Sequence, residues 1–155
     1  MTQPRISMYS LLLFALLTGS PFTQAAGPAD VIRLTVSLTS MQEQTYDKFV
    51  IVEVPGSDNY FQFATQEGGA YIFDVPIRSL TPAQQQRAKA FFAARGVAAV
   101  AAEATAPKTM QSFTIESYQK SFAGDDPGAG AALGIEFMHE VLRHAGEIRI
   151  VEGWR

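Results

Sequence analysis

The chain has 155 residues, 47% of them hydrophobic, with no cysteine and a formal net charge of −3. This length suits about one domain, and the lack of cysteine excludes disulfides and thiol nucleophiles. The slightly acidic balance argues against nucleic acid or an anionic membrane as the partner, because both require clustered lysine and arginine side chains.

The first 25 residues have the parts of a secretory signal peptide. Arg5 supplies the positive charge, residues 10–17 form a short apolar run, and residues 23–25 (Thr-Gln-Ala) form a small-x-small cleavage site. The apolar run is too short for a membrane span, which needs about 20 apolar residues. We therefore expect cleavage after Ala25, a periplasmic or secreted location, and a single mature domain over residues 26–155 with no membrane span.

The segment that follows the signal allows two interpretations. Val31–Thr39 alternates apolar and polar residues, as a half-buried strand does, and this alternation favours a strand. Val31, Leu34, Leu38 and Met41 also recur at helical spacing, and a proline precedes them at a position that suits the first turn of a helix.

Three strands are predicted next, over residues 49–54, 60–65 and 70–75. They are rich in β-branched and aromatic residues, and turn-forming residues at 55–59 and 66–69 separate them. Such short connections predict an antiparallel meander.

Alternation within these strands gives the predicted sheet two different faces. One face is uniformly apolar and comprises Val50, Val52, Val54, Phe61, Phe63, Tyr71, Phe73 and Val75. The other carries Phe49, Ile51, Tyr60, Gln62 and Ile72 beside Glu53 and Asp74. This second face is too apolar for plain solvent, so either the N-terminal or C-terminal segment covers it, or it binds a partner peptide. Phe49, Ile51, Tyr60, Gln62 and Ile72 are the candidate peptide-binding residues.

Capping signals predict a helix from Pro82 to about Gly96. Thr81 and Gln84 form a capping box around Pro82. An apolar stripe of Ala88, Phe91 and Phe92 is expected to pack on the sheet.

The rest of the chain is predicted to hold a strand, a helix and a strand. Residues 97–110 read as an irregular connection or a short strand, and residues 112–122 alternate as a strand does. A helix capped by Asp126 is expected to run to about Ala145 and to stop at Gly146. Its apolar face would comprise Leu133, Ile135, Phe137, Met138, Val141, Leu142 and Ala145. Residues 147–151 are a plausible closing strand.

No motif in the chain predicts catalysis, a metal site or a cofactor. His139 and His144 are five residues apart, whereas the zinc-protease helix needs a spacing of four for both imidazoles to reach one metal. The small residues over 128–134 match no phosphate-binding fingerprint and are expected to allow close helix packing. Glu136 and Glu140 are expected to form weak surface ion pairs with Arg143.

The run from residue 46 to residue 96 resembles the type III secretion chaperone-like and YbjN-like domains, also called TY-Chap domains. The shared elements are Tyr60-Phe61-Gln62-Phe63-Ala64 at the second strand and Leu80-Thr81-Pro82 before the helix. The resemblance implies an α+β fold in which an N-terminal helix and later helices pack on one face of a twisted antiparallel sheet. On this basis we expect a helix over residues 29–44. It also implies peptide binding without catalysis.

The sequence therefore predicts an exported, non-catalytic protein- or peptide-binding domain with a secretion-chaperone-like α+β fold. Two alternatives remain open. One is a periplasmic immunity or inhibitor protein, and the other is a small-ligand-binding protein or enzyme that uses the cleft between sheet and helices. A homodimer is a further alternative for the assembly.

Overall fold

The computed structural model describes residues 27–43, 48–106 and 109–154. The predicted signal peptide lies outside these residues. The elements, in chain order, are α1 (Pro28–Gln42), β1 (Lys48–Glu53), β2 (Tyr60–Thr65), η1 (Glu67–Gly69), β3 (Tyr71–Pro76), η2 (Ile77–Ser79), α2 (Pro82–Ala93), β4 (Ala99–Thr105), β5 (Ser112–Phe122), α3 (Pro127–Phe137), η3 (Met138–Leu142) and β6 (Arg149–Trp154). Antiparallel strands in the order β4-β5-β3-β2-β1-β6 form one sheet. This confirms the predicted α+β fold with an antiparallel meander at its centre.

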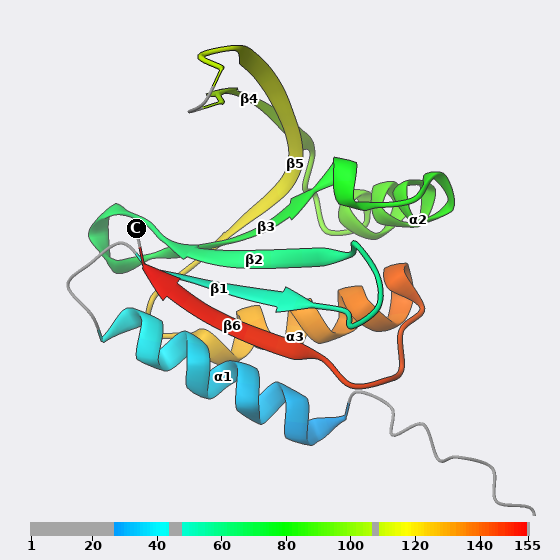
Figure 1. The fold of residues 1–155 in the computed structure, drawn as a ribbon. Helices are drawn as coiled ribbons and strands as arrows, with labels where there is room; N and C mark the ends of the chain where they lie inside the picture. Colours follow the sequence, from blue (N-terminus) through cyan, green and yellow to red (C-terminus); the bar gives the residue numbers. More distant parts are fainter. Residues whose placement is uncertain (1–26, 44–47, 107–108, 155) are drawn as a thin grey trace, which may run out of the picture.

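One face of the sheet carries the helices (Figure 1). The eight residues assigned from the sequence to the apolar face are all buried there. Phe137 of α3 lies among the aromatic rings of this core, with its centroid 5.8 Å from those of Phe61 and Phe91 and 6.0 Å from that of Phe73. Burial of such large rings removes much apolar surface from water and is the main source of stability in a fold without disulfides.

The first element is the helix α1, which confirms the helix expected for this segment from the resemblance, so the strand favoured by alternation was wrong. Leu34, Leu38 and Met41 are buried, whereas Ile32 and Val36 are 64% and 63% exposed. A helix directs the buried residues towards the core as one stripe, and this burial outweighs the strand preference of the β-branched residues.

The helix α2 follows its sequence signals closely. The Thr81 side chain accepts a hydrogen bond from the Gln84 amide, and the Gln84 side chain accepts one from the Thr81 amide at 2.8 Å. The expected stripe of Ala88, Phe91 and Phe92 is buried. Phe92 stacks on Tyr118 of β5 with a centroid separation of 4.4 Å.

The helix α3 begins where the sequence predicts and ends earlier. Asp126 caps it by accepting a hydrogen bond from the Ala129 amide at 3.1 Å. After Phe137 the chain makes the π-helical turn η3, and Arg143 then adopts a left-handed conformation with φ 56°. The expected end near Gly146 was therefore wrong, and Ala145 is exposed rather than part of the apolar face. The earlier end allows the chain to turn back towards β6.

The ion pairs on α3 also differ from expectation. Glu136 pairs with Arg95, which follows α2, at 2.9 Å, and Glu140 lies 4.0 Å from the same guanidinium group, so the expected Arg143 is not the partner. The Arg95 guanidinium carbon also lies 3.6 Å from the centroid of the Phe91 ring, a cation–π contact that helps to hold the group in position. Sequence spacing relates only residues of the same helix, so it does not identify a partner such as Arg95 in the segment after α2.

Small residues bring α3 close to the sheet, as expected. The Tyr71 hydroxyl is buried beneath the first turn, where it donates to the Asp126 carbonyl at 2.6 Å and accepts from the Gly130 amide at 3.1 Å. Burial raises the pKa of Tyr71 to about 12, so the hydroxyl keeps its donor proton further into the alkaline range than an exposed tyrosine does. A Cβ atom at Gly130 would lie 2.4 Å from the Tyr71 Oη, and one at Gly134 would lie 2.9 Å from the Phe61 ring.

We expect Gly130→Ala to lower the free energy of unfolding by about 1–3 kcal/mol, because the added methyl group forces Tyr71 or α3 to move. Gly128→Ala is the matched control, since a Cβ there meets only an Asp126 oxygen at 3.9 Å. It should be neutral or should stabilise by up to about 1 kcal/mol through helix propensity. Urea unfolding of both variants measures the difference, and equal effects would contradict this account of the packing.

Candidate binding surface

The sheet face opposite the helices is the candidate functional surface, and we call it the open face. Strand pairing places its side chains in rows across the sheet. One row is Gly153, Phe49, Ala64, Ile72 and Ser121, and the next is Val151, Ile51, Gln62, Asp74 and Gln119. At the end nearest the β1–β2 turn, Arg149, Glu53 and Tyr60 form a third row. All five predicted peptide-binding residues therefore lie together on one face.

Hydrogen bonds order the middle of the open face. Gln62 donates to one Asp74 carboxylate oxygen at 2.7 Å, and Gln119 donates to the other at 3.1 Å. The Asp74 side chain is consequently buried by its neighbours and 8% exposed, while Gln119 remains exposed. The three side chains form a polar strip in which hydrogen bonds to the Asp74 carboxylate hold both amide groups in place.

Apolar side chains lie on the β1 side of that strip. Phe49 covers Gly153, since a Cβ at this glycine would lie 2.3 Å from the Phe49 ring. Ile51 is opposite Val151, which is 37% exposed. Ile72 lies opposite Ala64, and both are partly exposed. The surface is thus apolar and accessible, a combination that marks interaction sites when the apolar residues are contiguous.

Charged groups close one end of the open face. The Arg149 guanidinium pairs with the Glu53 carboxylate across β1 and β6. Tyr60 lies opposite Glu53 on β2 and is partly exposed. A shallow hollow beside them is lined by these three residues and the β1–β2 turn. An aromatic side chain next to an ion pair offers both an apolar contact and polar groups to a partner.

Neither chain end, as far as the structure describes it, covers this face. The helix α1 packs with α3 and with β1, β2 and β6 on the helical side, where Leu34, Leu38 and Met41 are buried. The C-terminal β6 pairs beside β1 and extends the sheet sideways. In Figure 1 α1 and α3 lie below the strands of the sheet, on the same side. The expectation that a terminal segment covers the second face was therefore wrong for the described residues.

The described side chains form no arrangement that resembles a metal site. Within residues 27–43, 48–106 and 109–154, no three His, Asp or Glu side chains lie close enough together to hold an ion. His139 is exposed on η3, and a His144 ring nitrogen lies 2.9 Å from the Glu147 carbonyl. His144 therefore interacts with backbone near the helix end.

Besides Ser121 and Gly153, the sequence analysis missed four residues of the open face: Ala64, Gln119, Arg149 and Val151. Gln119 lies on β5, whereas Arg149 and Val151 lie on β6. These strands pair with β3 and β1 although they are distant in the sequence, and no local sequence pattern indicates such a pairing. The alternation of Arg149, Val151 and Gly153 was the available signal, but it does not indicate which strand β6 joins.

Comparisons of the chain with protein-family models, with curated proteins and with solved structures found no match. The family resemblance accordingly stays a prediction. Among the described helices, none combines the length and apolar character that crossing a membrane requires.

We expect Tyr60→Ala and Phe91→Ala to affect stability very differently. Phe91 is 5% exposed and contacts two aromatic rings of the core, so its truncation should cost about 3–5 kcal/mol. Tyr60 is partly exposed at one end of the open face, and its truncation should cost less than about 1.5 kcal/mol. Chemical denaturation of both variants tests this, and a loss at Tyr60 as large as that at Phe91 would mean that the open face is covered core.

Proposed function

We propose that the chain is an exported, non-catalytic domain that binds a protein or peptide segment on its open face. The observation that carries the proposal is the accessible apolar surface of Phe49, Ile51, Ile72 and Val151 on a sheet face that no described segment covers. A soluble domain gains nothing from an apolar sheet face in water, so this surface is best explained by a partner.

The polar groups of the open face favour a protein or peptide as that partner. Asp74 is held by Gln62 and Gln119, which leaves the exposed Gln119 amide beside the apolar side chains. Mixed apolar and amide surfaces of this kind suit side chains and backbone of another chain. The resemblance to secretion-chaperone-like domains supports the same function, because that family implies peptide binding.

A site-specific photo-crosslinker tests the binding surface in cells that produce the protein naturally. We expect a crosslinker at Ile51 or Ile72 to capture partner protein, and the same group at Gln86, exposed on α2, to capture none. Crosslinks confined to the α2 position would contradict the proposal. One stoichiometric partner would indicate an immunity or inhibitor protein, whereas many unrelated segments would indicate a chaperone. A bound small molecule that excludes crosslinking would instead indicate a ligand-binding protein.

With the captured partner purified, we expect Tyr60→Ala to weaken binding by about 1–2 kcal/mol, as for an aromatic anchor at an interface. Gln86→Ala is the control and should leave the affinity unchanged. Isothermal titration of both variants measures the effect, and equal affinities would remove Tyr60 from the binding surface.

The proposal that the protein is exported depends on residues 1–25 and is tested separately. We expect the protein isolated from its natural host to begin at Ala26 and to be found outside the cytoplasm, because the charged start, apolar run and cleavage site match a signal peptide. Intact-mass measurement of fractionated cells determines the start. Full-length chain in the cytosol would contradict export.

A further inference from the structure

The strand β4 forms an unprotected edge of the sheet. Its outer side has no strand partner among the described residues. Edge strands usually carry lysine, proline or several charges that discourage pairing with another chain, whereas β4 reads Ala-Val-Ala-Ala-Glu-Ala-Thr. The opposite edge, β6, has Arg149 and Glu152 and contacts α1. The backbone of β4 is therefore the free edge most open to another strand.

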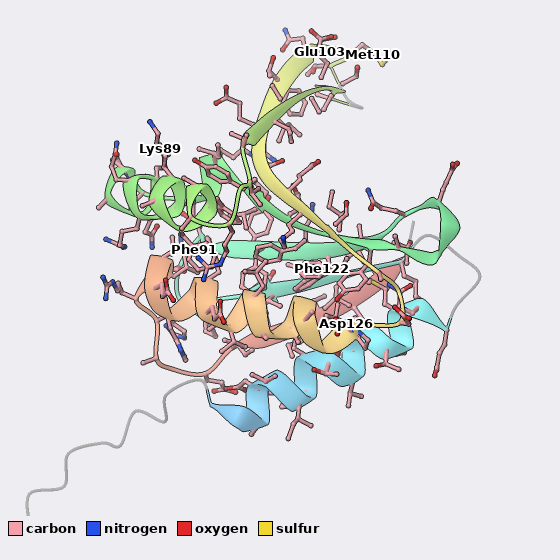
Figure 2. All side chains as sticks on the ribbon, turned by 180° about the vertical axis from the view of Figure 1, so that it is seen from behind. Lys89, Phe91, Glu103, Met110, Phe122 and Asp126 are labelled. Carbon is pink, nitrogen blue, oxygen red and sulfur yellow. The ribbon has the colours of Figure 1, made fainter. Side chains whose placement is uncertain are left out.

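This edge belongs to an arm that leaves the body of the protein. We use "arm" for β4 and the residues Ser112–Glu116 of β5. β3 pairs with β5 only over Ser117–Phe122, so the arm is a two-stranded extension. In Figure 1 it rises from the sheet on the side away from α1 and α3. Figure 2 shows Glu103 on the arm and Met110 beside it at the outer end, far from Phe91 and Asp126.

The register gives the arm one apolar and one polar face. The apolar face comprises Val100, Ala102, Ala104, Phe113 and Ile115, and the polar face comprises Ala101, Glu103, Thr105, Ser112, Thr114 and Glu116. Val100 is 42% exposed and Phe113 is 38% exposed. An added strand would thus meet apolar side chains on one side and polar ones on the other.

The charge of the polar face is negative. Glu103 lies opposite Thr114, and Glu116 lies opposite Ala101, so the two carboxylates are diagonal neighbours. Neither forms an ion pair with a described residue. Within Ala99–Ala106 and Thr109–Glu116 no side chain is basic. Arg78 of η2 lies beside the arm, with its guanidinium carbon 6.0 Å from the centroid of the Phe113 ring, and it forms no ion pair with Glu103 or Glu116.

This charge disfavours full-length pairing of β4 with a second copy of the chain. Antiparallel pairing of β4 with its own copy, centred on Ala102, would place the two Glu103 side chains diagonally across the new pair. With Glu116 from each copy, four carboxylates would gather on one face. Like charges at such cross-strand positions are destabilising.

We propose that the β4 edge binds an extended segment of another protein, with apolar residues on one side and lysine or arginine on the other. The segment adds a strand beside β4, its apolar residues align with Val100, Ala102 and Ala104, and its basic residues face Glu103. This inference rests on the proposed function, whose partner chemistry it specifies, but it uses a different surface from the open face.

Synthetic peptides test the chemistry directly. The probes are three labelled seven-residue peptides. One alternates valine and lysine, and one alternates valine and glutamate. The third has the same residues as the first, with its lysines grouped at one end. We expect the alternating lysine peptide to bind at least about tenfold more tightly than either of the others, because only it combines the alternation with the complementary charge. Fluorescence anisotropy measures the affinities. Equal binding of the two lysine peptides would show attraction by net charge alone and would overturn the proposal.

Charge reversal locates the site. Glu103→Lys should lower the affinity for the alternating lysine peptide by about fivefold to tenfold and raise the affinity for the glutamate peptide, because the charge opposite the added strand changes sign. Glu67→Lys, at an exposed residue of η1, changes the net charge equally and should have little effect. Melting curves should match for both variants, because both positions are exposed. Equal effects of the two substitutions would overturn the proposal.

A second copy is distinguished by sedimentation of the protein alone. If the chain forms a dimer that Ala102→Lys dissociates and Ala83→Lys, at an exposed residue of α2, does not, then β4 pairs with itself and the proposal is wrong. If the protein shows no preference for the alternating lysine peptide, while a crosslinker at Ile51 still captures a partner, only the inference about β4 is overturned. That result would leave the proposed function of the open face standing.

Discussion

The close approach of α3 to the sheet is the contact on which the rest of the fold depends. Gly130 lies against Tyr71 and Gly134 against Phe61, at distances that exclude a larger side chain. This proximity lets Phe137 reach rings from the sheet and from α2. With no disulfide to restrain the chain, stability must come from this dense aromatic core, and each helix is oriented by its contact with it.

The position of the helices also determines which face of the sheet is the candidate binding surface. Because α1, α2 and α3 all pack on one face, the alternation of β1, β2 and β3 leaves Phe49, Ile51 and Ile72 on the other. The open face is thus a consequence of a single layer of helices on one face of the sheet. The arm has a different origin, because β5 continues beyond the end of β3 and pairs there only with β4.

Together these surfaces suggest how an extended partner is recognised. The open face offers apolar side chains around fixed amides, whereas the arm offers free backbone groups and carboxylates. In these proposals, apolar contact would provide affinity without strict sequence requirements, and charge at Glu103 and Glu116 would provide selectivity. The two proposals therefore describe different contributions to binding, and their experiments separate them.

Local chemistry in the sequence determined much of this protein. The capping signals at Thr81 and Asp126 act within a few residues, so the starts of α2 and α3 were predictable. Side chains in a strand alternate between the two faces of the sheet, so the sequences of β1, β2 and β3 showed which residues share the apolar face. Tertiary structure decided the rest. Residues 31–39 fit both a strand and a helix, and only burial of Leu34 and Leu38 against the core selected the helix. Which strand β6 joins, where α3 ends, and that Arg95 pairs with Glu136 all depend on contacts between distant parts of the chain. Sequence periodicity cannot encode such contacts, because it reports which face of an element is apolar but not which neighbour covers it.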